Sequence, residues 1–218
     1  MDVKILNGIN MFESLQDDEL VTVSNHLIRR QFPKNSIIIN EGDTTNSLYF
    51  ILSGKVKAFL NDPNGKEVIL NIVNMGEYFG EVSLFDDGLR SVSIMTLEDS
   101  QFAVLEKPAF LTCIAAHPEL ALTIIKGLTT RLRGLTDSVR SLALMDVYGR
   151  VAHTLLELAI DKDGQKVISG GITYKELAKR VGASSKMAGR VMKDLKTGGF
   201  ITKSAKNLVI NQSFPSSW

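Results

Sequence analysis

The sequence predicts an α+β chain in which a β-roll is followed by a long helix and a winged helix-turn-helix. Three observations support this fold class. Short apolar runs alternate with glycine-bearing turns over residues 32–107, as in small all-β barrels and rolls. Residues 118–145 carry a heptad pattern of apolar residues, which is typical of a long helix with a partner. Residues 172–195 form two amphipathic segments on either side of Gly182.

The β-roll is predicted to begin at Phe32 and to end near Pro108. Its apolar runs are SIIIN, LYFILS, KVKAFL, EVILNIV, SVSIMTL and QFAVLE. The Asn64-Gly65 pair between two of these runs favours a tight hairpin, because both residue types tolerate the positive φ angles of such turns. The preceding residues 9–31 have a partly periodic apolar pattern and are predicted to form a short helical region.

The long helix predicted over residues 118–145 has a narrow apolar seam. Its members recur at alternating spacings of four and three: Ala121, Ile125, Leu128, Leu132, Leu135, Val139 and Leu142. Charged residues flank this seam, as in a solvent-flanked coiled coil. The alternative is a single helix buried against its own domain. The narrowness of the seam favours a homodimer.

Composition restricts the class of protein. No apolar run approaches the ~20 residues of a membrane span, and the N-terminus does not resemble a signal peptide, so a cytoplasmic protein without membrane contact is expected. The single cysteine, Cys113, cannot form an internal disulfide or hold an iron–sulfur cluster by itself. His26, His117 and His153 are far apart in the sequence without metal-ligand spacing, so no metal site is predicted.

Charge is divided unevenly along the chain, although the formal net charge is only +1. Residues 1–145 carry 13 Lys and Arg against 18 Asp and Glu, whereas residues 146–218 carry 12 against 6. A basic C-terminal part indicates a polyanionic partner for that part. The alternative is an ordinary fluctuation of charge.

The C-terminal motif reads ITYKELAKRVGASSKMAGRVMKDL over residues 172–195, after a predicted helix at 147–160 and a predicted loop at 161–171. Thr173 and Glu176 match a capping box, so a helix is expected to begin there. Gly182 supplies the turn, and Ser184 or Ser185 can cap a second helix. The buried face of that helix is predicted to contain Met187, Ala188, Val191 and Leu195.

The second helix of this motif presents a basic and polar outer face, which is the arrangement of a recognition helix for the DNA major groove. The following segment FITKSAKNLVI is predicted to be a two-stranded wing. The residues predicted to contact DNA are Thr173, Ser184, Ser185, Lys186, Arg190, Lys193, Lys203 and Lys206. The alternative is a helical hairpin with a solvated basic face.

The stretch GEYFGEVSLFDDGLRSVSI over residues 76–94 is the most informative part of the roll. Its Gly-Glu-Val-Ser segment, residues 80–83, can form a short helical turn with free backbone N–H groups, which bind phosphate. Arg90 can pair with the same phosphate, Ser91 adds a hydroxyl, and Glu81 can accept a hydrogen bond from a ribose hydroxyl. The alternative is a glycine-rich turn with solvated charges.

Over essentially its full length the chain resembles the family of the catabolite activator protein and the fumarate-nitrate reduction regulators. The resemblance rests on FGEVSLFDDGLRS, LALMDVYGRVAHTLLELA and ITYKELAKRVGASSKMAGRVMKDL. It implies a cyclic-nucleotide-binding β-roll at residues 1–117, a dimerisation helix at 118–145 and a winged helix-turn-helix at 146–218.

The resemblance also implies an effector site. Its expected residues are Gly80, Glu81, Val82, Ser83, Arg90, Ser91, Leu135 and Thr136. Cyclic-AMP-responsive members of the family contact the adenine through a Thr-Ser pair, which matches Leu135 and Thr136 here. Leu135 can neither donate nor accept a hydrogen bond, so this chain departs from the adenine-binding pattern. In the recognition helix, the Arg-Glu pair of well-known members is replaced by Ser185 and Lys186, whereas Arg190 is retained.

The expected function is therefore an effector-gated, sequence-specific transcription regulator, and an activator by resemblance. It would bind palindromic double-stranded DNA as a homodimer and contact RNA polymerase. The expected effector is cyclic AMP, cyclic GMP or cyclic di-GMP, with no other cofactor. One alternative is a family member whose pocket is vestigial. Another is a cyclic-nucleotide-binding regulatory subunit, and an enzyme is not expected because no catalytic constellation is present.

Overall fold

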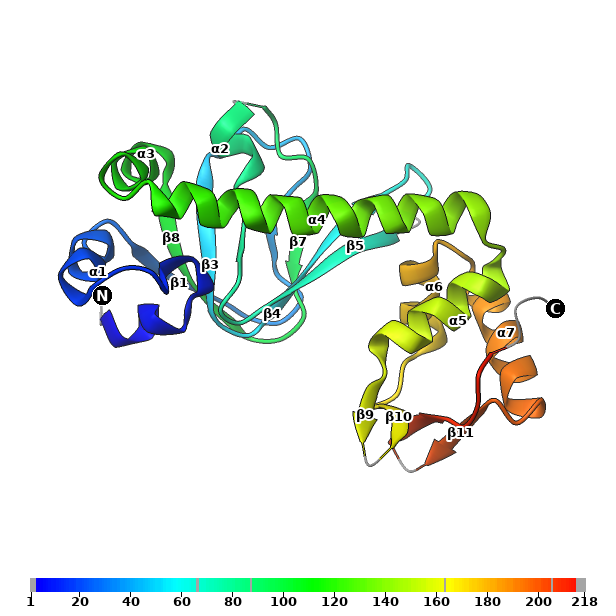
Figure 1. Ribbon diagram of the computed structural model, residues 1–218. Helices are drawn as coiled ribbons and strands as arrows, with labels where there is room; N and C mark the ends of the chain where they lie inside the picture. Colours follow the sequence, from blue (N-terminus) through cyan, green and yellow to red (C-terminus); the bar gives the residue numbers. More distant parts are fainter. Residues whose placement is uncertain (1–2, 66, 87, 163, 205, 215–218) are drawn as a thin grey trace. The chain divides into compact units, whose positions relative to one another are not determined.

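The computed structural model describes residues 3–65, 67–86, 88–162, 164–204 and 206–214 (Figure 1). Contacts between residues divide the chain into two compact units, and each is described by itself. The first comprises Met1–Leu60 and Ile69–Arg133, and the second comprises Asn61–Val68 and Gly134–Trp218. The predicted mixture of helices and sheets is confirmed, whereas the three-part division at residues 117 and 145 remains a prediction.

The first unit is built on a β-roll of two four-stranded sheets, with strand orders β1-β8-β3-β6 and β2-β7-β4-β5. The strands are β1 (Ile28–Phe32), β2 (Ile37–Ile39), β3 (Ser47–Ser53), β4 (Lys55–Asn61), β5 (Glu67–Asn74), β6 (Tyr78–Phe79), β7 (Ser93–Thr96) and β8 (Ser100–Glu106). The pairing of β3 with β8 is antiparallel and begins with Ser47 opposite Glu106. The predicted hairpin at Gly65 lies between β4 and β5, with a φ angle of 78° at the glycine.

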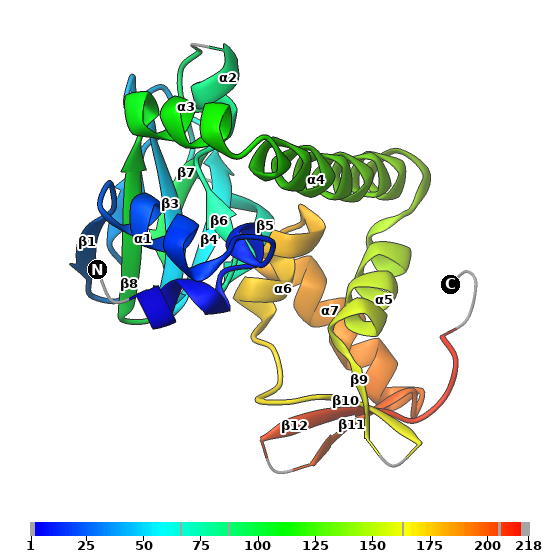
Figure 2. The ribbon, with the colours of Figure 1, turned by 60° about the vertical axis from the view of Figure 1, so that its left-hand side comes forward.

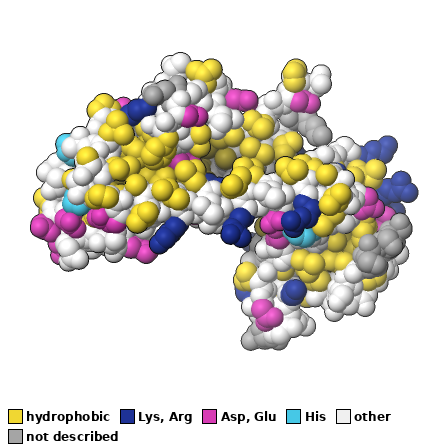
Figure 3. All heavy atoms as spheres, turned by 45° about the horizontal axis from the view of Figure 1, so that its top comes forward, with side chains coloured by type: hydrophobic (Ala, Val, Ile, Leu, Met, Phe, Trp, Pro, Cys, Tyr) yellow, Lys and Arg dark blue, Asp and Glu magenta, His cyan; other side chains and the backbone are white. Residues whose placement is uncertain are grey.

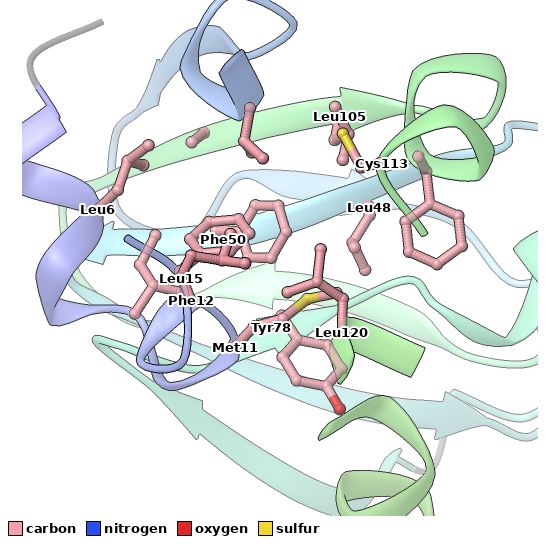
Figure 4. Packing of buried hydrophobic residues seen from close by; sticks show 14 of the residues in the cluster. Leu6, Met11, Phe12, Leu15, Leu48, Phe50, Tyr78, Leu105, Cys113 and Leu120 are labelled. Carbon is pink, nitrogen blue, oxygen red and sulfur yellow. The ribbon is translucent and has the colours of Figure 1, made fainter. Parts of the chain in front are cut away.

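Strand alternation separates two apolar clusters in the first unit. Phe102 and Val104 of β8 point into the roll. Ala103 and Leu105 point the other way, to a second cluster that the sheet shares with helical segments before and after the roll. Figure 4 shows side chains of the second cluster from the N-terminal turns, the sheet and the helical segments after it. This cluster attaches the helices to the roll.

The predicted helical region at residues 9–31 is correct only in its first part. The N-terminal helical elements are η1 (Val3–Gly8), η2 (Asn10–Phe12) and α1 (Asp17–Ser24). From Ile28 onward the chain forms β1, which pairs antiparallel with β8. Backbone hydrogen bonds to a strand far away in the sequence outweigh the local apolar pattern there.

Three helices follow or interrupt the roll: α2 (Val82–Asp86), α3 (Lys107–Ala116) and α4 (Glu119–Leu144). The prediction of one long helix at 118–145 is confirmed by the 26 residues of α4. Within the described residues no single helix is long and apolar enough to cross a membrane. Only α3 and α4 taken together reach that length and composition, and they are bent by 114° at their break.

Helix α4 has two apolar faces with different surroundings. Leu120 and Ile124 are buried in the second cluster of the first unit. The outward residues are exposed in the single chain: Leu122, Ile125, Leu132, Leu135, Val139 and Leu142. Figure 3 shows apolar side chains gathered on the face of the molecule that carries this helix. Most of the predicted seam is therefore uncovered, whereas Leu128 partly packs against the core.

Beyond the last part of α4, the described residues of the second unit combine three helices with a four-stranded sheet of order β11-β12-β10-β9 (Figure 2). Its elements are α5 (Val147–Leu158), β9 (Ile160–Lys162), β10 (Gln165–Ile168), α6 (Tyr174–Val181), α7 (Ser185–Thr197), β11 (Ile201–Ser204) and β12 (Asn207–Ile210). The predicted wing is formed by β11 and β12. The predicted loop at 161–171 is wrong in part, because β10 pairs with β12 as well as with β9.

Helix α7 buries a slightly different face from the one predicted. Ala188, Val191 and Leu195 are buried as expected, but Met187 is 41% exposed and Met192 takes its place in the core. The buried positions thus follow the spacing i, i+3, i+4, i+7 of one helical stripe, and Met187 lies one residue outside it.

Candidate functional site

The turn between β6 and α2 is shaped by Gly80. This glycine has a φ angle of 88°, which side-chain-bearing residues rarely adopt. A Cβ atom there would lie 2.8 Å from the Ser47 carbonyl oxygen and 2.9 Å from an Arg90 guanidinium nitrogen. The predicted short helix follows at once as α2, whose first N–H groups lie in the Gly-Glu-Val-Ser segment. Only glycine lets the chain pass this close to Arg90.

Arg90 lies under this turn and is only 4% exposed. Its guanidinium donates to the Gly80 carbonyl at 2.6 Å, to the Ser47 carbonyl at 2.8 Å and to the Thr45 hydroxyl at 3.1 Å. Burial lowers the pKa of Arg90, and the nearby Tyr49 opposes this effect. Three of the five guanidinium N–H groups serve these contacts, so two donors remain for a ligand.

Glu81 is the second buried charge of the turn, at 3% exposed, and it is paired with a residue that the sequence reasoning missed. Arg131 of α4 lies 2.5 Å from the Glu81 carboxylate. It also donates to the Tyr78 carbonyl and lies over the Tyr78 ring, 5.0 Å from its centroid. The heptad pattern favours a solvated flank for Arg131, and that interpretation is wrong. The ion pair connects the turn directly to α4.

Close packing at Gly127 strengthens this connection. A Cβ atom at this position of α4 would lie only 2.2 Å from the Tyr78 hydroxyl oxygen. The hydroxyl is buried and has no hydrogen-bond partner among the described residues. Burial raises the pKa of Tyr78. Helix α4 therefore approaches β6 as closely as glycine allows, one turn before Arg131.

The other predicted effector residues are placed differently. Val82 and Ser91 are exposed, whereas Ser83 is buried and its hydroxyl has no partner among the described residues. The structure therefore brings Gly80, Glu81, Val82, Ser83 and Arg90 together at one turn. Leu135 and Thr136 are exposed on α4 beyond Arg133, where the first compact unit ends. Their role stays a prediction.

Substitution of Gly80 by alanine is expected to destabilise the first unit more than the same change at Gly42. Both glycines have φ angles near 86°, at 88° and 85°, but a Cβ at Gly42 meets nothing within 4 Å. Gly42→Ala should therefore cost only backbone strain, about 1–3 kcal/mol. Gly80→Ala should cost more, because it also displaces Arg90. Thermal unfolding of the two variants measures the difference, and equal losses would contradict this account of Gly80.

The helix-turn-helix is capped as predicted. The Thr173 hydroxyl accepts a hydrogen bond from the Glu176 N–H at 3.1 Å, and the Ser184 hydroxyl accepts one from the Met187 N–H at 3.2 Å. Gly182 adopts the left-handed conformation with a φ angle of 64°. The reciprocal half of the predicted capping box differs, since the Glu176 carboxylate accepts instead from Arg180.

The predicted DNA-contacting side chains are all exposed. Ser185, Lys186, Arg190 and Lys193 lie on the outer face of α7. Lys203 lies on β11, and Lys206 precedes β12. The structure thus provides a cationic helix beside a cationic wing within one compact unit, which is the arrangement of a winged-helix nucleic-acid interface.

Arg150 of α5 links the end of α6 to the residue that follows α4, within the second unit, and was also missed from the sequence. Its guanidinium donates to the Val181 carbonyl, at the end of α6, and to the Met145 carbonyl, both at 2.9 Å. The two carbonyls belong to helix ends that lack intrahelical partners. Only the tertiary structure reveals this contact, because its partners are 31 and 5 residues away.

A roll with a phosphate-type turn, joined to a winged helix-turn-helix, defines the class of DNA-binding transcription regulators that carry a nucleotide-sensor fold. Comparison with known families agrees. Residues 29–117 match the cyclic nucleotide-binding domain, and residues 149–212 match the Crp-like helix-turn-helix domain. The chain belongs to the CRP family of transcription regulators.

Relatives and solved structures support this membership. The chain is 30% identical over 214 residues to the CRP-like cAMP-activated global transcriptional regulator of Mycobacterium tuberculosis, covering 96% of each chain. It is 31% identical over 201 residues to the cAMP-activated global transcriptional regulator CRP of Pasteurella multocida, covering 89% of this chain and 95% of that one. These relatives are regulators and not enzymes.

Among solved structures, the c-di-GMP responsive global regulator CLP of Xanthomonas campestris is similar, with a TM-score of 0.78 and 26% identity. The similarity covers 90% of this chain and all of that chain. The catabolite activator protein of Thermus thermophilus has a TM-score of 0.56 at 29% identity, covering 93% of this chain and 94% of that one.

Proposed function

We propose that this protein is an effector-gated activator of transcription that binds palindromic DNA as a homodimer. The observation that carries the proposal is the ion pair between Glu81 and Arg131 at 2.5 Å. It joins the phosphate-type turn to α4, the helix whose outward face is apolar and exposed. A ligand that alters the surroundings of Glu81 therefore acts directly on the helix that holds the dimer.

The effector proposed is a cyclic nucleotide or dinucleotide: cyclic AMP, cyclic GMP or cyclic di-GMP. The N-terminal N–H groups of α2 and the two remaining donors of Arg90 suit a phosphate. The named relatives respond to cAMP or c-di-GMP. Leu135 has no hydroxyl, so the base of the proposed effector is not held by a hydrogen bond from that position. The lack of a hydroxyl at Leu135 also favours the second candidate function, that of a family member that binds DNA without a nucleotide.

Gating is proposed to be a shift between two packings of the paired α4 helices. An effector can shift this equilibrium only if it binds one state better than the other. Because coupling is reciprocal, DNA then raises effector affinity by the same factor as the effector raises DNA affinity. As an activator the dimer would also contact RNA polymerase.

DNA recognition is proposed to rest on α7, with two copies reading half-sites one helical turn apart. Arg190 suits a bidentate contact to guanine, and Lys186 suits guanine O6 and N7 or a phosphate. Ser185 is too short for a bidentate guanine contact. Thr173, Ser184, Lys193, Lys203 and Lys206 are assigned to the backbone of the DNA, because Lys and hydroxyl groups commonly contact phosphates.

Selection of binding sites from a random DNA library tests this assignment. Arg190→Ala should flatten one position of the selected motif, at a cost of roughly 1–3 kcal/mol. Lys186→Glu should move the preference at another position toward cytosine, because a carboxylate accepts from the cytosine amino group. Lys203→Ala serves as the control and should weaken binding to all sequences alike, with a smaller salt dependence. An unchanged motif for Arg190→Ala would exclude base readout by this residue.

A further inference from the structure

Three metal-binding side chains meet at the junction of α1, α3 and α4, far from the phosphate-type turn in sequence. Glu19 lies on α1, His117 directly follows α3, and Glu119 is the first residue of α4. The His117 Nδ1 atom is 3.2 Å from a Glu19 carboxylate oxygen and 3.6 Å from a Glu119 carboxylate oxygen. All three ligand atoms lie within 4.8 Å of one another. Figure 1 shows α1 and α3 at the same end of the first unit.

Local hydrogen bonds hold the Glu19 carboxylate and the backbone of His117 in place. The second carboxylate oxygen of Glu19 accepts from the Gln16 N–H at 2.7 Å, within the capping box of α1. The backbone N–H of His117 donates to the Cys113 carbonyl at 2.8 Å, and Pro118 restricts the backbone of His117 from the other side. One carboxylate and the backbone from which the imidazole extends are therefore held in place before any ligand arrives.

The charge at this cluster is not balanced by the protein. Two carboxylates share one imidazole, and within the described residues neither carboxylate has another ion-pair partner. The side chain of His117 is 13% exposed, that of Glu19 32% and that of Glu119 41%. The cluster is thus shielded enough to strengthen attraction for a cation and open enough for one to enter.

We propose that Glu19, His117 and Glu119 bind a divalent transition-metal ion, for which Zn²⁺ is the representative. The 3.2 and 3.6 Å separations of the His117 nitrogen from the two carboxylate oxygens lie on either side of the ~3.4 Å between two tetrahedral ligands that are each about 2.1 Å from one ion. One imidazole and two carboxylates are a donor set for such ions, and three protein ligands leave a fourth position for water. Glu119, the most exposed ligand, has room to turn toward the ion.

The sequence predicted no metal site, because the histidines are isolated and Glu19 is 98 residues from His117. A bound ion would connect α1 to the start of α4 through three ligands. It would stabilise the folded first unit relative to the unfolded chain, in which these residues are apart. The N-terminal helix and the base of α4 would then move as one body.

Isothermal titration of the full-length, tag-free and chelator-treated protein with ZnCl₂ tests the proposal. We expect saturable binding of one ion per chain and a Zn²⁺-dependent rise in unfolding temperature. Glu19→Gln and Glu119→Gln should each weaken binding by at least about tenfold, since the loss of even an outer contact costs 10–100-fold. The Gln16 cap should survive Glu19→Gln, because glutamine also accepts the capping hydrogen bond.

His117→Ala should abolish binding at this site, and His153→Ala is its matched control. His153 also lies near a carboxylate, with its Nδ1 atom 3.5 Å from a Glu157 carboxylate oxygen. Among the described residues, however, no third metal-binding side chain joins this pair. The control should bind Zn²⁺ as the wild type does. Saturable binding that persists in His117→Ala overturns the proposal. It is also overturned if the wild type binds no Zn²⁺, because the cluster is then only a hydrogen-bonded clamp between α1 and α4.

Discussion

Replacement of Leu132 by aspartate is expected to convert the proposed dimer into monomers and to abolish DNA binding. Leu132 is 65% exposed in the single chain and lies in the middle of the α4 seam. Pairing of two seams would bury one aspartate from each copy, and a buried charge without a partner costs several kcal/mol. This corresponds to a loss of more than about 100-fold in the dimerisation constant.

Sedimentation velocity and a DNA-binding titration measure this effect. Thr130→Asp is the matched control, because it adds the same charge to an exposed position of the same helix outside the seam. It should remain dimeric and bind DNA as the wild type does. A dimer that persists in Leu132→Asp places the interface elsewhere. Monomers that still bind DNA with unchanged affinity contradict the role of the dimer in recognition.

Replacement of Arg90 by leucine is expected to lose at least about 100-fold in affinity for a cyclic nucleotide. Charge-assisted hydrogen bonds contribute about 1.5–3 kcal/mol each, and a guanidinium can make two with one phosphate. The structure adds a second expected effect. The Gly80 and Ser47 carbonyls lose their donors, which should lower stability by about 1–3 kcal/mol for each group left buried.

The two effects are separated by measuring unfolding first and then titrating at a temperature where the variant is folded. Cyclic AMP, cyclic GMP and cyclic di-GMP are the ligands to titrate. Thr45→Val removes one contact of Arg90 while keeping its charge, so it should bind nearly as tightly as the wild type. Arg90→Leu with unchanged affinity contradicts the phosphate role. A wild type that binds none of these ligands but binds DNA supports the vestigial-pocket alternative.

Local patterns were sufficient for much of the second unit. The caps at Thr173 and Ser184 and the left-handed turn at Gly182 were predicted from residue type and spacing alone. Such predictions succeed because the atoms involved lie within three or four residues of one another. The extent of α4 was predictable for the same reason, since its heptad pattern is continuous along the chain.

The candidate effector turn was predicted in outline, but its contacts were not. The glycine and the short helix after it follow from the local sequence. The direction of Arg131 does not, because a heptad position fixes an angle around the helix and not the neighbour that the helix packs against. The choice between a solvated and a paired Arg131 depended on where Glu81 lies in the folded roll.

The sequence by itself therefore determined the succession of roll, long helix and helix-turn-helix, the caps and turns of the helix-turn-helix, the apolar seam of α4 and the basic face of α7. Only the tertiary structure decided that residues 28–32, 160–162 and 165–168 form strands, that Met192 replaces Met187 in the core, and that Arg90 is held by Thr45 and Ser47. It also decided the meeting of Glu19, His117 and Glu119. These features depend on contacts between segments that are distant in the sequence. The free energy of such contacts cannot be inferred from the residues of either segment alone.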